Sequence, residues 1–223
     1  MKLRMRIRKG REVKFISQLD MMRALERAMR RARLPVKFTE GFNPRPKMSF
    51  TPAIPVGITS DAEYVDVEFT RELALEEIYD SLNSTLPPGI ALLKVGDAEG
   101  KLPLSSVNRA LYTVVVGLGG ASREALEEAI GKILSSTEIK MVKKSKGKEK
   151  EVNIASGIYG IKINTAENDR FTLKMELAAG QDASVTPFMV VDALREYVPS
   201  LNVLGVNKDE LFVFDRGRKI LPL

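Results

Sequence analysis

Three arginines early in the chain have the spacing of neighbours on a helix. Arg23, Arg27 and Arg30 follow one another at intervals of four and three residues, so a helix would place them on one face. A planar guanidinium group binds phosphate through two parallel hydrogen bonds, so such a row matches the phosphates along a nucleic-acid strand. In the alternative interpretation, Asp20 and Glu26 each form an ion pair with an arginine one turn further along the helix. The face is then an ordinary solvent-exposed surface that binds no ligand.

The segment from Glu40 to Lys47, with the sequence EGFNPRPK, is the second candidate site. Two prolines flank Arg45 and restrict the backbone, which lowers the entropy lost when Arg45 and Lys47 are presented to a ligand. Phe42 is of the type that stacks on a base, and Asn43 of the type that reads a base edge in single-stranded RNA. If Phe42 packs in the core instead, the segment is only a stiff turn, so the exposure of Phe42 separates the two interpretations.

A lysine-rich segment over about residues 138–154 is predicted to form a β-hairpin with its tip near Gly147. Lys143, Lys144 and Lys146 in this hairpin would attract a polyanion in a salt-dependent way without reading its sequence. A hairpin tip whose lysines only keep the protein in solution fits the same pattern.

The 223 residues include no Cys and no His, and this excludes several classes of site. Disulfides, thiolate-held zinc or iron–sulfur centres and the Ser-His-Asp triad all need one of these residues. Asp66 and Glu68 form a carboxylate pair, but two positions apart on a strand they lie roughly 7 Å from each other, too far to share one magnesium ion without another ligand. We therefore expect no catalytic residue, no metal site and no cofactor.

Charge is segregated along the chain. Residues 1–50 hold 15 Lys and Arg against 4 Asp and Glu, whereas residues 51–100 hold 2 against 10. The basic segment has the charge pattern of a polyanion-binding surface, unless the two segments are neighbours in the fold and neutralise each other. The absence of an apolar run of roughly 18 residues and of a signal-peptide core predicts a cytoplasmic protein with no membrane partner.

Hydrophobic periodicity predicts the same order of elements twice along the chain. The predicted strands cover residues 2–8, 48–50, 62–69, 90–95, 111–117, 158–164, 171–177 and 211–214, and the predicted helices cover 17–33, 70–82, 122–134 and 186–197. Ser17 and Asp20 resemble a capping box at the start of the first helix, with Asp in place of the usual Glu. The inward face of this helix is expected to carry Leu19, Met22, Leu25, Met29 and Ala32.

This order of elements is that of the split βαβ, or ferredoxin-like, unit. The predicted fold class is α+β, with two tandem ferredoxin-like (βαββαβ) units that have antiparallel sheets. The units are expected at residues 1–98 and 107–215, followed by a basic tail at 216–223. In such a sheet the first and third strands are neighbours, so Arg4, Arg6 and Arg8 would lie across from Asp66 and Glu68, on the face away from the helices.

Several stretches of the chain resemble a known bacterial family. These are FISQLDMMRALERA at residues 15–28, EGFNPRPKMSF at 40–50, PVG at 55–57 and EYVDVE at 63–68. They are similar to the radical SAM-linked protein family, a domain of unknown function whose members lie beside, or are fused to, radical S-adenosylmethionine enzymes. The resemblance implies a radical SAM enzyme as partner, supplied as a separate chain because this one has no cysteines to hold a cluster.

The combined pattern predicts a non-catalytic accessory protein that binds RNA and presents it to a partner radical SAM enzyme. One alternative is a protein-interaction module that docks directly on that enzyme without RNA. Another is a histidine-free, metal-dependent nuclease. The sequence identifies neither the RNA nor the oligomeric state.

Overall fold

The computed structural model describes residues 1–145, 148–180 and 183–223. Over these ranges the fold is mixed α+β, with four α-helices and mostly antiparallel strands. The chain divides into two compact units. Unit 1 contains residues 1–107 and 210–223, and unit 2 contains residues 108–209. No helix in the described ranges is both long and apolar enough to cross a bilayer.

Unit 1 is built on a sheet in which β1 is central. This strand pairs antiparallel with β3 on one side and with β4 on the other, and β2 pairs antiparallel with the outer side of β3. The elements of this part, in chain order, are β1 (Lys2–Lys9), α1 (Gln18–Arg31), β2 (Met48–Phe50), β3 (Thr59–Glu68), α2 (Leu75–Thr85) and β4 (Ile90–Asp97). Short 3-10 turns lie at Arg11–Val13 and Leu104–Ser106.

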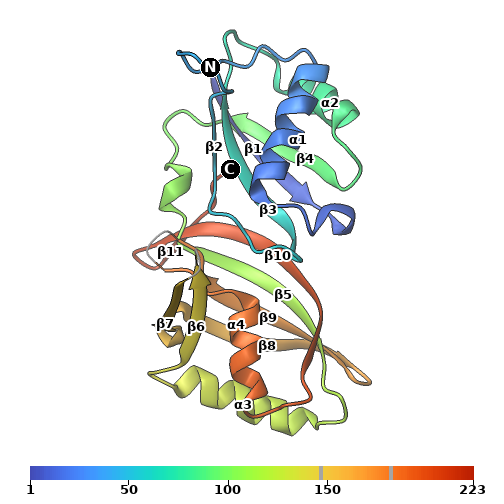
Figure 1. Ribbon diagram of the computed structural model, residues 1–223, viewed down its shortest axis with the longest axis vertical. Coiled ribbons are helices and arrows are strands. Elements are labelled where there is room, and N and C mark those ends of the chain that lie inside the picture. Colours follow the sequence, from blue (N-terminus) through green and yellow to red (C-terminus); the bar gives the residue numbers. More distant parts are fainter. Residues whose placement is uncertain (146–147, 181–182) are drawn as a thin grey trace. The chain divides into compact units, whose positions relative to one another are not determined.

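The two faces of this sheet follow from the alternation in β1. Leu3, Met5 and Ile7 are buried in the apolar core together with residues of α1, α2, β3 and β4. The two helices pack side by side against this face (Figure 1). Arg4 and Arg6 lie on the other face, where Arg4 is directly opposite Asp66 and Arg6 opposite Tyr64. The predicted cross-strand charge pairing is therefore confirmed for Arg4 and Asp66.

In unit 2, β5 pairs with β9 and β9 pairs with β8, each antiparallel. The strand order is β10-β5-β9-β8, and β6 and β7 form a separate hairpin. The elements are β5 (Arg109–Gly117), α3 (Arg123–Ser135), β6 (Lys140–Ser145), β7 (Lys148–Asn153), a 3-10 turn (Ala155–Gly157), β8 (Ile158–Glu167), β9 (Arg170–Ala178) and α4 (Pro187–Arg195).

The long strand β10 (Asn202–Asp215) begins in unit 2 and ends in unit 1, because the division between the units falls after Asp209. It is followed by β11 (Arg218–Ile220), which pairs with residues 213–215 of β10. Residues 216–223, expected as a basic tail, thus include a short strand of unit 1.

Side-chain caps fix the start of three helices. Ser17, Ser122 and Thr186 each accept a hydrogen bond from the backbone N–H three residues on, as N-cap residues do. The predicted cap at Ser17 is confirmed, and its hydroxyl also donates to the carboxylate of Asp20 at 2.7 Å. The helix α2 differs from the prediction: it begins at Leu75 rather than near residue 70, and its N-cap Ala74 has no side-chain hydrogen bond.

Candidate nucleic-acid interface

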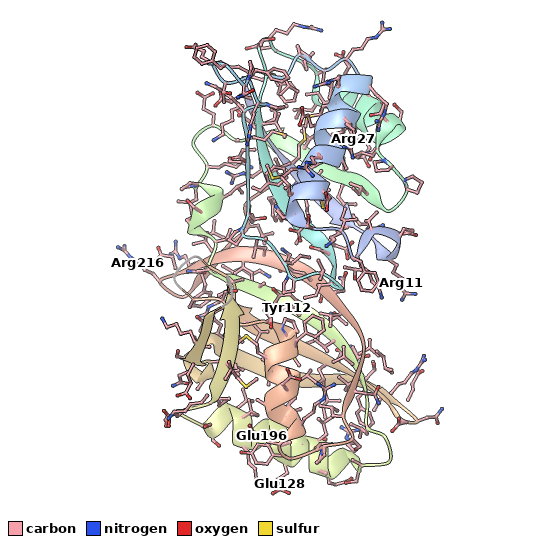
Figure 2. All side chains as sticks on the ribbon, in the orientation of Figure 1. Arg11, Arg27, Tyr112, Glu128, Glu196 and Arg216 are labelled. Carbon is pink, nitrogen blue, oxygen red and sulfur yellow. The ribbon has the colours of Figure 1, made fainter. Side chains whose placement is uncertain are left out.

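The three predicted arginines of α1 lie on its exposed face. The helix buries Met21, Ala24, Leu25, Ala28 and Met29 against the sheet. Arg23, Arg27 and Arg30 fall between these positions and are exposed to solvent. Figure 2 labels Arg27 on this helix. The row therefore has the orientation that phosphate binding requires.

Acidic neighbours partly neutralise the row. Arg23 lies 3.5 Å from Asp20, and Arg30 lies 3.3 Å from Glu26. Hydrogen bonding from Ser17, together with the charge of Arg23, lowers the pKa of Asp20 below its usual value. Both ion pairs are solvent-exposed, and such pairs are weak enough for a phosphate to replace the carboxylate. Among the described residues, Arg27 has no ion-pair partner, so a ligand phosphate need not displace a carboxylate from it.

The predicted loop at 40–47 is the tip and second arm of a narrow antiparallel ribbon. The backbone of Phe38 bridges Pro46, and the N–H of Lys47 donates to the carbonyl of Lys37 at 2.8 Å. Thr39 closes the tip through two hydrogen bonds with Arg45. The N–H of Thr39 donates to the carbonyl of Arg45 at 2.8 Å, and the N–H of Arg45 donates to the hydroxyl of Thr39 at 3.0 Å. We call residues 36–48 the ribbon.

The tip of the ribbon presents its side chains to solvent. Phe42 is fully exposed, at 105% of its reference area, and Asn43 and Arg45 are exposed as well. The interpretation in which Phe42 packs in the core is therefore wrong. Gly41 adopts a φ of 117°, in the region that favours glycine, which turns the chain at the tip. The exposed aromatic ring of Phe42 therefore remains available for stacking.

Lys47 faces an acidic neighbour. Its ammonium group lies 3.9 Å from the carboxylate of Glu68, and that of Lys37 lies 3.6 Å from the same carboxylate. A hollow of about 300 Å³ opens here, and its lining includes Lys2 and Asp66 as well as Lys47 and Glu68. Glu68 thus offsets part of the positive charge at Lys37 and Lys47, and the acidic segment neutralises part of the basic one.

A pocket joins the two candidate sites. The end of α1 and the base of the ribbon enclose about 170 Å³, lined by Glu26, Met29, Arg30, Arg33, Leu34, Val36, Phe38 and Pro46. Arg30 from the predicted row and Pro46, next to Arg45 and Lys47 in the sequence, therefore border one space. The sequence analysis missed Arg33 and Phe38. The available signal was the pair Lys37-Phe38, a basic residue beside an aromatic one as at Phe42 to Arg45.

The hairpin lysines belong to unit 2, whereas α1 and the ribbon belong to unit 1. The predicted hairpin is present as β6 and β7, with Lys143 opposite Lys150 and Lys144 opposite Glu149. Lys146 lies outside the described residues. The structure thus gives a register for two of the three lysines and leaves their role as a prediction.

The carboxylate of Asp66 is engaged by cations of β1. Arg4 donates to both of its oxygens, and the ammonium group of Lys2 lies 3.2 Å from Oδ2. Next to this pair, burial raises the pKa of the Tyr64 hydroxyl, and Arg6 opposes that effect. A carboxylate held by two cations is a poor ligand for a magnesium ion, so the geometry favours a structural role for Asp66.

Comparison with known proteins places the chain in a family and identifies its fold relatives. The sequence model described as "Uncharacterized protein conserved in bacteria (DUF2344)" matches residues 2–187. No curated protein matches the sequence.

Solved structures with a similar fold come from ribonucleoprotein complexes. One chain of a Cbf5-Nop10-Gar1 complex superposes with a TM-score of 0.52 at 8% identity, over 96% of this chain and 50% of that one. A chain of the archaeal box H/ACA sRNP Nop10-Cbf5 complex gives 0.50 at 8% identity, over 92% and 46%. A chain of an H/ACA RNP bound to a substrate RNA containing 2'-deoxyuridine gives 0.50 at 6% identity, over 92% and 46%. The chain therefore spans about half the length of these relatives, and the likeness concerns the fold.

Proposed function

The chain belongs to the family of uncharacterized proteins conserved in bacteria (DUF2344), and on the geometry of its site we propose that it binds RNA through the basic surface of unit 1. The observation that carries the proposal is the pocket that joins the exposed arginine row of α1 to the ribbon. An arginine row positions phosphates, whereas exposed aromatic and amide groups contact bases.

The proposed contacts divide by chemistry. Phosphates bind Arg23, Arg27, Arg30, Arg45 and Lys47. Phe42 stacks on a base, and Asn43 hydrogen-bonds to a base edge. The hairpin lysines Lys143, Lys144 and Lys146 add long-range attraction that depends on salt.

The finer fold class is part of the same proposal. In unit 1 the strand order β4-β1-β3-β2, with helices between the first and second and between the third and fourth strands, supports a ferredoxin-like unit. In unit 2 the order β10-β5-β9-β8 supports a second one. One structure with a similar fold belongs to an H/ACA RNP bound to a substrate RNA, and this is compatible with the proposal that the present chain binds RNA.

The partner enzyme is proposed from the sequence resemblance alone. The stretches at residues 15–28 and 40–50 resemble the radical SAM-linked family, and both contribute to the basic surface. In this proposal the protein holds an RNA substrate while a radical SAM enzyme on a separate chain modifies it.

Charge reversal on α1 tests the proposal. The variant Arg23→Glu/Arg27→Glu/Arg30→Glu is compared with Arg123→Glu/Lys132→Glu on α3, whose cations sit in exposed ion pairs of the same kind. Binding is followed by fluorescence anisotropy of labelled transfer and ribosomal RNA fragments across a salt series. For single strands, log affinity falls against log salt with a slope of about −0.7 per phosphate contacted.

The α1 variant is expected to bind RNA more weakly and with a shallower dependence on salt, because it lacks the phosphate contacts. The α3 variant is expected to keep the affinity and the salt dependence of the unmodified protein. A loss in the α3 variant in proportion to the two charges it reverses, against three in the α1 variant, would mean that only net charge matters. Unchanged affinity in the α1 variant would refute the assignment of the site.

A second candidate function is direct docking on a partner protein. Phe15, which precedes α1, and Leu19, in the first turn of that helix, are 73% and 52% exposed, and Val56 is 56% exposed. Where exposed apolar side chains form one contiguous patch, they mark protein interaction sites. Co-purification with a radical SAM enzyme after nuclease treatment, lost in Phe15→Asp/Leu19→Asp, would support this function.

A further inference from the structure

The pocket at the end of α1 has walls of two kinds. Met29, Leu34, Val36, Phe38 and Pro46 make its inner lining apolar. Arg30, Arg33 and Glu26 supply its charged groups. An apolar slot with an aromatic ring and a few polar groups suits a flat, partly polar ligand that carries negative charge nearby.

The size of the pocket restricts that ligand. Sites for drug-sized molecules enclose about 300–1,000 Å³, whereas this pocket encloses about 170 Å³. A single planar ring system fits such a volume, and a larger cofactor does not. The Phe38 side chain is 42% exposed, so part of its ring remains open to a ligand.

The backbone at Arg33 supports a functional role for the pocket. Arg33 has a φ of 54°, in the left-handed region that L side chains adopt at a cost. The N–H of Leu34 donates to the carbonyl of Met29, and that of Arg33 to the carbonyl of Arg30, so Arg33 occupies the position of a Schellman motif that glycine prefers. Strain retained in a lining residue is a reason to look for a function of its side chain.

The charges around the pocket select the ligand further. Arg33 has no ion-pair partner among the described residues, and Arg30 has only the exposed contact with Glu26. The arginine row of α1 leads to the pocket at Arg30, so a strand bound along the row would bring its backbone to this edge. Glu26 supplies an acceptor suited to the amino group of a base.

We infer that this pocket takes one unstacked nucleobase of a single-stranded RNA, with Phe38 stacking on the base and Arg33 binding the adjoining phosphate. The inference rests on the proposed RNA-binding function and names its substrate class: single strands or loops, in which a base can leave the stack, rather than a continuous duplex.

The test compares strands that have bases with a strand that has none. The probes are a labelled oligoadenylate of about twelve nucleotides, within the usual range of single-strand sites, and an abasic ribose-phosphate oligomer of equal length. The variants are Phe38→Ala, Phe38→Tyr, which keeps the ring, and Tyr79→Ala. Tyr79 lies on α2 outside the pocket and is 40% exposed, close to the value for Phe38.

Loss of the Phe38 ring is expected to weaken oligoadenylate binding about tenfold, because one base loses its stacking partner. The abasic strand should lose less than about twofold, since its phosphates meet the same arginines. Phe38→Tyr and Tyr79→Ala should bind both strands like the unmodified protein. Thermal unfolding of each variant verifies that it is folded.

Two results would overturn the inference while leaving RNA binding in place. One is that both strands bind in a salt-dependent way and that Phe38→Ala lowers the affinity for the two strands equally or for neither of them. The other is adenosine monophosphate binding as tightly as the oligomer, which would make the pocket a site for free nucleotides. If neither strand binds at low salt, the proposed function fails and this inference fails with it.

Discussion

Arg4 holds both carboxylate oxygens of Asp66 across the two central strands of unit 1, with Nε at 2.6 Å from Oδ1 and the terminal nitrogen at 2.9 Å from Oδ2. Each side chain is only 2% exposed. The two residues are directly opposite in the register of β1 and β3, so the pair fixes the relative position of these strands. Buried guanidinium and carboxylate groups tolerate this environment only while they remain paired.

Asp66→Ala is expected to lower the free energy of unfolding by about 3–5 kcal/mol, because it leaves the Arg4 guanidinium buried without its counterion. Urea unfolding measures the loss. Asp61→Ala is the matched control, since Asp61 pairs with Arg8 at 2.7 Å but in solvent, where such pairs contribute about 0–1 kcal/mol. Replacing both partners, as in Arg4→Leu/Asp66→Leu, should recover part of the stability. Equal small effects of Asp66→Ala and Asp61→Ala would contradict this account.

Arg33→Gly is expected to stabilise the protein and weaken its RNA binding at once. Glycine removes the cost of a left-handed residue at the end of α1, about 1 kcal/mol, and also removes a guanidinium from the pocket. Thermal unfolding and RNA anisotropy measured on the same sample give the two effects. Arg31→Gly, within the last turn of the helix, is the contrasting control and should destabilise. A stabilised variant with unchanged RNA affinity would assign Arg33 no part in binding.

Ser17→Ala is expected to lower stability at neutral pH by about 1 kcal/mol, because α1 loses its N-cap. The hydrogen bond from Ser17 is also the largest cause of the lowered pKa of Asp20. A carboxylate whose pKa is lower in the folded state stabilises the protein above its unfolded pKa, near 3.8, and loses that contribution as the pH falls through the folded value. Urea unfolding between pH 7 and pH 2 should therefore show a smaller acid-induced loss in the variant. If the free energy of unfolding falls as steeply with decreasing pH in the variant as in the unmodified protein, the Ser17 hydrogen bond is not what lowers the pKa of Asp20.

Phe42→Ala is expected to weaken binding of single-stranded RNA at least fivefold, since stacking contributes about 1–3 kcal/mol per base. Its fully exposed ring makes no core contact, so the unfolding temperature should change no more than it does for an ordinary surface substitution. Anisotropy and differential scanning calorimetry measure the two quantities. A large drop in unfolding temperature would show that the ring has a structural role.

Local patterns in the sequence were sufficient for the elements around the site. Strict alternation identified β1 and its charged face, and the Ser17 capping box identified the first residue of α1. These signals are local, because a strand alternates with period two and a cap acts within one turn. They also placed Arg23, Arg27 and Arg30 on the exposed side of α1.

The buried face of α1 was only partly predicted. The expected stripe of Leu19, Met22, Leu25, Met29 and Ala32 is replaced by Met21, Ala24, Leu25, Ala28 and Met29. Leu19 is 52% exposed. Ala24 and Ala28 lie on the buried face, because small side chains let a helix approach a sheet closely. The prediction gave most weight to large apolar residues and therefore left these two alanines out.

The pocket was beyond the reach of sequence reasoning, because its walls come from two segments that only tertiary structure brings together. Nothing within residues 36–38 shows that Phe38 faces Met29 and Arg33 across a shared space. The left-handed backbone of Arg33 is equally hidden, since the usual mark of that conformation is glycine.

The hydrogen bond from Arg4 to the carbonyl of Pro222 joins residues 218 positions apart, and residues 210–223 belong to the same unit as residues 1–107. During translation, the start of the chain therefore waits for its last partners while all of unit 2 is synthesised. Domains usually fold in the order in which they leave the ribosome. In this protein the unit that emerges first is completed after the second one, and the nascent chain carries an unfinished sheet while residues 108–209 are synthesised.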